Sequence, residues 1–275
     1  MYSGSTISSA SGRLLGAHQR IDKIARKQLD QLCPKNNFPS IKNILRFEGN
    51  NGPDAIKRKS PAKDEPWHFI DPFDHDDHNL IKQIDLHYKN LVVALKNKDE
   101  IKSAFEAAWI AHAIVDGLTP AHHFPYEEKM SELRCGQDKA SRNSLYKKLI
   151  MNGGTKTEAI KNNWKMWGPK GLYTNHANFE TGVAVLLTAF NRLGSCPKAS
   201  KISILKKQEL GRWFRGQSQS IAKLDIYNQF CESGWTLDVA KKVRKQLIPE
   251  IIQAVTLVWY KAHLDSQTTQ KALPA

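Results

Sequence analysis

The sequence predicts an all-α protein, folded as a single-domain helical bundle with a core that can hold a site. Apolar residues recur at helical spacing along nearly the whole chain. No stretch alternates apolar and polar residues as a strand does, and no internal repeat or low-complexity linker divides the chain. The 275 residues, 40% of them hydrophobic, suffice for one large domain. We expect this domain to cover residues 13–265, between flexible tails at 1–12 and 266–275.

Seven segments carry the helical pattern in chain order. We expect helices over roughly 13–32, 78–97, 99–117, 139–151, 174–192, 202–224 and 236–264. The third of these ends at Gly117, and Pro120 follows shortly after, as is typical of a helix C-terminus. Between Cys33 and Pro72 turn-forming residues dominate, so this segment is expected to be irregular.

Basic residues strongly outnumber acidic ones. The chain has 41 Lys and Arg against 27 Asp and Glu, a formal net charge of +14. Such a surface favours polyanions: nucleic acid, anionic lipid headgroups or phosphorylated substrates. Ten Lys and Arg against three Asp and Glu fall within the stretch from about 129 to 170. We interpret this stretch as a Lys-rich insertion that is either a binding patch or a solvated helical surface.

Three further features limit the class of protein. No run of 18 apolar residues is present, which excludes a membrane-spanning helix. The N-terminus lacks the apolar core of a secretory signal, so we expect a cytoplasmic protein, with secretion by another route left open. The four cysteines are scattered, without a CxxC pair, and are expected to be ordinary thiols.

The helix expected at 99–117 places a histidine and an aspartate on its buried face. Its apolar stripe runs through Phe105, Trp109, His112 and Asp116 in steps of four, three and four. His112 and Asp116 are one helical turn apart and therefore project from the same side. A buried, unpaired carboxylate is costly, so we expect a compensating group nearby.

Two other helices repeat the pattern. His18 lies among the core positions of the first helix, and His176 and Glu180 lie one turn apart on the apolar face of the helix at 174–192. A lone histidine on such a face is more often a satisfied core residue than a ligand. Three helices together favour a divalent metal, because imidazole and carboxylate are good zinc ligands and the ion compensates buried charge. Without any thiolate, this ligand chemistry indicates catalytic rather than structural zinc.

The irregular segment offers two more candidates, Asp54 and His68, which can meet in space without helical spacing. The acidic run that follows, from Asp71 to His78, is expected to cap the next helix, since acidic residues favour helix N-termini. We do not expect His75 or His78 to bind metal.

These motifs, taken in order, resemble the superfamily of bacterial zinc-dependent phospholipases C and fungal single-strand zinc nucleases. Its most specific motif, His-x-x-x-Asp-x-x-x-x-x-His, matches His112, Asp116 and His122. The family's His-x-x-x-Glu pair and its "HF-x-D" stretch match the other candidates in chain order. The metal ligands that the resemblance implies are His18, Asp54, His68, His112, Asp116, His122, His176 and Glu180.

The resemblance implies two or three zinc ions in a helical domain, with Asp116 bridging two of them. Family members bind one ion through an N-terminal Trp, and no Trp precedes His18 in this chain. His123, the neighbour of His122, is an alternative ligand at that position.

The activity that the resemblance implies is phosphodiester hydrolysis by a zinc-activated water, with Asp54 as the catalytic residue that orients or deprotonates it. Glu180 and the "HFIDP" run favour the phospholipase C branch and a phospholipid-type substrate, on an anionic phospholipid surface. Phe69 and Asp71 match substrate-binding positions of the nucleases, and the basic charge also suits nucleic acid.

Two alternatives therefore remain open. One is a zinc-dependent single-strand nuclease or nucleotidase of the same superfamily. The other is a non-catalytic binding module stabilised by metal, with the basic-aromatic run "GRWFRG" at 211–216 as its contact patch. Nothing in the sequence indicates an obligate protein partner.

Overall fold

The computed structural model describes residues 16–59, 66–137, 139–189 and 195–268. Within these ranges every regular element is helical and none is a strand, which confirms the predicted all-α class. None of the helices in the same ranges combines the length and the apolar character needed to cross a membrane.

The helices follow one another with short connections. They are α1 (Ala17–Leu32), α2 (Ile41–Ile44), α3 (Pro53–Lys59), α4 (Asn79–Lys96), α5 (Glu100–Gly117), α6 (Tyr126–Leu133), α7 (Leu145–Leu149), α8 (Lys156–Trp167), α9 (Leu172–Ala189), α10 (Ala199–Lys207), α11 (Leu210–Ala222), α12 (Ile226–Ser233), α13 (Leu237–Lys242) and α14 (Ile248–Gln267). Short 3-10 turns lie at Leu45–Phe47, Gly49–Asn51, Pro120–His122 and Lys139–Ser141, and a π-helical segment at Val243–Leu247 joins α13 to α14.

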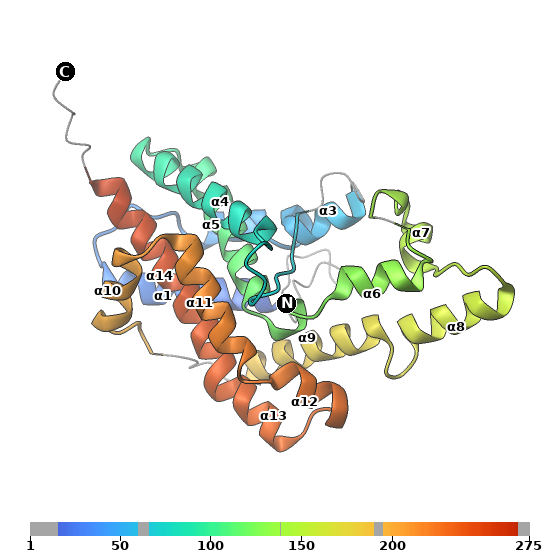
Figure 1. Cartoon of the computed structure of the whole chain (residues 1–275). Helices are drawn as coiled ribbons and strands as arrows, with labels where there is room; N and C mark the ends of the chain where they lie inside the picture. Colours follow the sequence, from blue (N-terminus) through green and yellow to red (C-terminus); the bar gives the residue numbers. More distant parts are fainter. Residues whose placement is uncertain (1–15, 60–65, 138, 190–194, 269–275) are drawn as a thin grey trace.

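The main core is built around α5. Helix α5 packs against α4, α14 and α1, and most of its residues are buried. Trp259 of α14 is fully buried, and its indole Nε1 donates a 3.1 Å hydrogen bond to the carbonyl oxygen of Ala107. Figure 1 shows α6, α7 and α8 extending to one side of this bundle. There α6 and α8 contribute Tyr126, Met130 and Met166 to a smaller apolar cluster.

Several predicted helices match the structure closely, because their apolar period is unbroken. The predictions for α1, α4, α5 and α9 agree with the described helices to within a few residues, although residues 13–15 and 190–192 lie outside the described ranges. Helix α14 continues to Gln267, two residues into the expected C-terminal tail. The predicted N-terminal tail lies outside the described residues.

Two predicted helices are wrong as continuous elements. The helix expected at 139–151 is reduced to α7, which begins where the Ser144 side chain accepts a hydrogen bond from the backbone N–H of Lys147. The helix expected at 202–224 divides into α10 and α11, because Gln208 adopts an extended backbone conformation between them.

The sequence prediction also missed helices, of which α8 lies in the Lys-rich insertion. Thr155 caps its N-terminus by accepting from the N–H of Glu158, and the Glu158 carboxylate accepts from the N–H of Gly154. A Thr followed three residues later by Glu is the signature of a capping box, so the signal was present in the sequence.

Candidate metal centre

The C-terminal end of α5 is held tightly against two other helices, and this fixes the position of Asp116. A Cβ on Gly117 would lie 2.5 Å from Leu80 Cδ2 of α4 and 2.5 Å from Phe214 Cζ of α11. Only glycine fits at such an approach. The preceding turn of α5 therefore presents Asp116 and His112 to the interior, where both side chains are buried.

Asp116 lies at the centre of four imidazoles. Its Oδ2 is 2.6 Å from His68 Nδ1 and 3.2 Å from His112 Nε2. Its Oδ1 is 3.3 Å from His18 Nε2 and 3.9 Å from His122 Nε2. Each carboxylate oxygen thus faces a different set of nitrogens, which is the arrangement that a carboxylate bridging two cations requires.

Burial and the nearby charged groups shift the pKa of Asp116, and likewise that of His112, in opposite directions. Burial works to raise the pKa of Asp116, but the imidazoles of His122, His112 and His18 are among the groups that hold it well below its usual range. Burial disfavours protonation of His112, but nearby carboxylates, Asp116 first among them, hold its pKa well above its usual range. Asp116 is therefore ionised at neutral pH, and its charge must be balanced locally.

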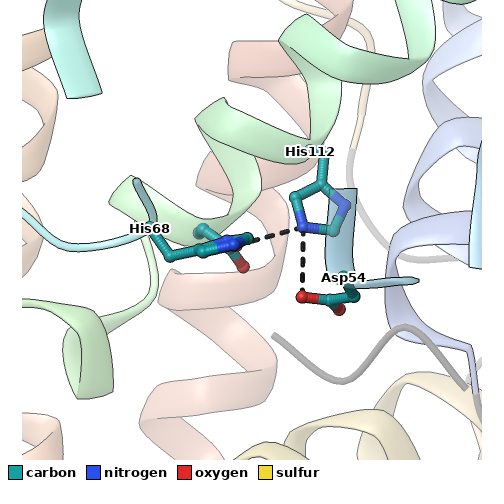
Figure 2. Close-up of side chains that lie close together, drawn as sticks. Asp54, His68 and His112 are labelled. Atoms are coloured by element: carbon teal, nitrogen blue, oxygen red, sulfur yellow. Dashed lines mark hydrogen bonds and ion pairs between the residues drawn. The ribbon is translucent and has the colours of Figure 1, made fainter. Parts of the chain in front are cut away.

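The first group of candidate ligands combines Asp54, His68, His112 and Asp116, one ligand atom of each lying within 4.8 Å of the others. His112 Nε2 is 3.7 Å from Asp54 Oδ1, and Figure 2 shows the carboxylate and the two imidazoles pointing toward one another. Asp54 is in the first turn of α3, and its side chain is 18% exposed, whereas the other three are buried. Asp54 is therefore the member of this group that solvent can reach.

The second group combines His122, His176 and Glu180. Glu180 Oε1 lies 2.8 Å from His122 Nε2 and 3.2 Å from His176 Nε2. Burial works to raise the pKa of Glu180, but His176 and His122 are among the groups that hold it well below its usual range. The helical His–Glu pair of α9 thus meets the histidine of the turn that follows α5.

His122 faces oxygen acceptors on both of its ring nitrogens. Its Nδ1 is 2.7 Å from the carbonyl oxygen of His68, and its Nε2 is 2.8 Å from Glu180 Oε1. Burial lowers the pKa of His122 to about 4, so the ring is neutral at neutral pH and carries one N–H. Either tautomer therefore leaves one nitrogen lone pair directed at an oxygen. A cation between the imidazole and the carboxylate removes this repulsion.

The third group combines His18, Glu48 and His112, and Glu48 was missed by sequence reasoning. Glu48 is fully buried, and its Oε2 is 3.4 Å from His112 Nδ1. The rings of His18 and His112 stack with their centroids 3.9 Å apart. Glu48 lies in the irregular segment between two 3-10 turns, and no periodicity there marks it as buried.

Asp22 is a second missed carboxylate. It is fully buried, and neither carboxylate oxygen has a hydrogen-bond partner within the described part of the chain. Burial and the proximity of Glu48 raise its pKa. A signal for Asp22 was present, because it follows His18 by four residues, the same spacing as in the two predicted His–carboxylate pairs.

The alternative ligand His123 has a different role. Its Nε2 lies 2.9 Å from the carbonyl oxygen of Gly117 and 3.0 Å from Ser218 Oγ, and it belongs to none of the three groups found among the described residues. The structure thus brings His122, rather than His123, to the other candidate ligands.

The two predicted substrate residues occupy different surroundings. The ring of Phe69 packs beside the second group, with its centroid 5.1 Å from that of His122 and 5.3 Å from that of Tyr126. Asp71 is exposed, and its Oδ1 accepts hydrogen bonds from the backbone N–H groups of Phe73 and Asp74. Asp71 is not part of any of the three ligand groups within the described ranges.

The acidic run from Asp71 to His78 does not cap α4, contrary to the prediction. The N-cap residue of α4 is His78, which makes no side-chain capping bond, and Asp77 instead accepts from the N–H of Asp71. Arg215 holds this loop, because its guanidinium donates to the carbonyl oxygens of Asp74 and Asp77. In the "GRWFRG" run, Trp213 and Phe214 are core residues, and Arg215 has this structural role.

The first and third groups share His112, and His122 of the second group lies 3.9 Å from Asp116 of the first, so the three groups form one candidate centre of nitrogen and oxygen ligands. Side chains grouped in this way could hold metal ions. Comparisons of the chain with protein-family models, with curated proteins and with solved structures find no match. The assignment of a candidate metal centre rests on the geometry and the ligand chemistry of these residues.

Proposed function

We propose that this chain is a zinc-dependent phosphodiester hydrolase of the phospholipase C type. The observation that carries the proposal is the environment of His122, a neutral imidazole with oxygen acceptors at both nitrogens, one of them the ionised Glu180. A cation between His122 and Glu180 would take the imidazole nitrogen and the carboxylate oxygen as ligands. Cations would likewise fit between the two oxygens of Asp116 and the imidazoles that they face. The resemblance of the eight ligand positions to the zinc phospholipase and nuclease superfamily supports zinc as that cation.

The residues present fit zinc. Neutral imidazole nitrogens and carboxylate oxygens are its usual ligands in catalytic sites, and four cysteines that lie outside all three groups leave the ligand set free of thiolate. His112 presents one nitrogen to Asp116 and the other to Glu48, so a carboxylate orients its ring. Such a carboxylate–histidine pair fixes a metal-binding imidazole in position and raises its basicity.

Bound zinc lowers the pKa of a coordinated water toward neutrality and offsets negative charge on phosphoryl oxygens. Asp54, the partly exposed member of the first group, orients the attacking water and accepts its proton as the oxygen–phosphorus bond forms. The ester oxygen then leaves phosphorus and takes a proton from solvent. Asp116 holds the four surrounding imidazoles in position throughout this step.

A single-strand nuclease is the second candidate, and the net charge of +14 favours it. Phosphate contacts dominate the affinity of proteins for nucleic acid, and the Phe69 ring beside His122 offers an aromatic contact for a base. We rank the phospholipase reading first, because Glu180 and the "HFIDP" run match that branch.

The test combines metal analysis with a substrate panel. Purified, zinc-supplemented protein should contain about two or three zinc ions per chain, as the number of ligands implies. It should hydrolyse a chromogenic phosphodiester and diacyl phospholipids faster than single-stranded DNA or RNA. An Asp54→Asn variant should keep most of its zinc and lose turnover, because three ligands of its group remain.

Each other outcome has a definite meaning. Zinc below about one equivalent would overturn the metal centre itself. Cleavage of single strands that falls steeply with salt, without lipid turnover, would establish the nuclease. A zinc-loaded protein that turns over no substrate would establish the non-catalytic binding module.

A further inference from the structure

The Lys-rich insertion carries large apolar side chains that the core does not use. Tyr146 is 72% exposed, Ile160 72% and Trp164 68%, although residues of this size are usually buried at least in part. Leu149 and Ile150 are exposed as well. We call these five residues the apolar face of α7 and α8.

The members of the apolar face on α8 lie on one side of the helix. Ile160 and Trp164 are one turn apart, and together with Ile150 and Trp167 they line a single open hollow of about 840 Å³. Asn162 and Met166 on the other side of α8 are buried. Helix α8 is therefore anchored by one side and offers the other to a partner.

Lysines accompany the apolar face along the chain, and one of them, Lys156, lines the hollow. Residues 145–170 contain six Lys and a single acidic residue, Glu158, whose carboxylate is engaged by the backbone N–H of Gly154. Lys147, Lys156, Lys161 and Lys165 are all exposed. An apolar surface with aromatic residues and a basic rim matches the composition of a membrane interface, where Trp and Tyr lie at headgroup level and Lys meets anionic lipids.

We propose that the apolar face of α7 and α8 docks on an anionic phospholipid surface. Its aliphatic members favour lipid over single-stranded nucleic acid, because Ile160, Ile150 and Leu149 offer no ring on which a base stacks. The lysine rim supplies the complementary charge. That this docking brings phospholipid substrate to the candidate metal centre rests on the proposed phospholipase function.

An aromatic contact connects the hollow to α9, the helix that carries two of the candidate ligands. Trp167, in the wall of the hollow, lies 4.7 Å from Tyr173 of α9, centroid to centroid. Tyr173 is one turn before His176, and the His176 ring lies 5.2 Å from that of Tyr126. A lipid surface at the hollow would therefore be adjacent to the helix that presents His176 and Glu180.

The experiment measures sedimentation of the full-length protein with vesicles. Phosphatidylcholine vesicles with and without phosphatidylserine are the probes, at low and moderate salt. Wild-type protein should sediment with the anionic vesicles, and less with the neutral ones. Ile160→Ser/Trp164→Ser and Lys161→Glu/Lys165→Glu should each weaken this partitioning by about tenfold or more, the second through loss of charge attraction.

The matched control replaces exposed apolar residues elsewhere. Ile101→Ser/Leu237→Ser removes side chains that are at least as exposed, on α5 and α13, and should bind vesicles as the wild type does. Melting temperatures of all variants verify that they are folded. Equal binding by the apolar-face variants and the control, or no binding by the wild type, would overturn the proposal. Loss of single-stranded RNA binding in the same variants, with vesicle binding intact, would reassign the face to nucleic acid.

Turnover of a water-soluble chromogenic phosphodiester separates this inference from the proposed function. The apolar-face variants should retain it, because none of their substituted residues belongs to the three ligand groups. Vesicle binding without any hydrolysis would keep the docking face and refute the hydrolase. Hydrolysis of the soluble diester without vesicle binding would refute the docking face alone.

Discussion

Helix α5 carries two buried carboxylates, Glu106 and Asp116, that are balanced in different ways. Glu106 Oε1 lies 2.9 Å from Lys102 Nζ, and its Oε2 lies 2.5 Å from His87 Nδ1. The Lys102 side chain is half exposed, so the ammonium group keeps contact with water while it pairs with Glu106. The charge of Glu106 is therefore balanced by side chains of the protein.

Asp116 lies instead among imidazoles, which are neutral or charged according to their surroundings. One of them, His122, is neutral at neutral pH and has an oxygen opposite each nitrogen. Glu106 is thus part of an ion pair that stabilises a helix, whereas Asp116 lies in a group of side chains with the composition of a cation site. Glu106 pairs with the permanently charged Lys102, whereas we propose that the groups around Asp116 take up a cation.

Asp116→Asn should have the largest effect of the substitutions that probe this comparison. It removes the carboxylate whose two oxygens face imidazoles of all three groups. Zinc content should therefore fall by about one equivalent or more and hydrolysis by more than about 100-fold, beyond the range typical of residues that only support ligands. The free energy of unfolding should fall by about 3–5 kcal/mol, as when one partner of a buried charge cluster is removed. Elemental analysis, initial rates and denaturant titration measure the three quantities.

His78→Ala is the control for Asp116→Asn. His78 lies in the exposed loop, and its contact is with the Arg215 guanidinium. Its replacement should change stability by no more than about 0.5 kcal/mol and leave zinc content unchanged. Equal losses in the two variants would mean that the centre has been misplaced.

Glu106→Gln should have an intermediate effect on stability and none on zinc. Loss of its two charged contacts should cost about 1–3 kcal/mol at pH 7. Burial works to raise the pKa of Glu106, but His87 and Lys102 lower it below its usual value. The wild-type advantage is therefore present above the pKa of the unfolded chain and disappears as the pH falls through the lower folded value. Thermal unfolding of both proteins between acidic and neutral pH would reveal this convergence; parallel curves would argue against it.

Asp22→Asn should have a smaller effect on stability than Glu106→Gln, and one of the opposite sign. Burial and Glu48 raise the pKa of Asp22, so the folded state holds this proton more tightly than the unfolded chain does. In chelator-treated protein, stability should therefore decline as the pH rises from the unfolded pKa through the folded one. The Asn variant lacks this decline and should be more stable at neutral pH by about 1 kcal/mol. Destabilisation of the variant at every pH would show that Asp22 has a partner other than Glu48 and His112.

The sequence predicts those helices whose apolar residues recur at regular helical spacing along the chain. Helix α5 could be placed because its buried face keeps helical spacing from Phe105 onward, and His112 and Asp116 could be singled out because they are the polar residues on that face. The pair His176 and Glu180 was found by the same reasoning. The resemblance to the zinc superfamily also implies that this pair shares an ion with His122, and the structure gives the distance of 2.8 Å between His122 Nε2 and Glu180 Oε1.

Other features depend on contacts that no local pattern encodes. Glu48 is buried because α5 and α1 cover the irregular segment that contains it, so its sequence neighbours gave no sign of burial. Helix α8 is predominantly polar and basic. Its buried residues are Asn162 and Met166, so its buried side has no apolar stripe by which the helix could be recognised. The capping box of Thr155 and Glu158 was the signal that would have located it.

The separation of the candidate ligands along the chain has a consequence for folding. His68 and Asp116 are 48 residues apart in sequence, and His122 and Glu180 are 58 apart. An ion held by such residues closes loops of these lengths, and the described cysteines are free thiols that close none. A cross-link over a loop of about 100 residues restricts the unfolded ensemble by roughly 4–5 kcal/mol, with shorter loops somewhat less. Metal supply during synthesis would then select which chains fold to completion, since the cross-links exist only once the ion arrives.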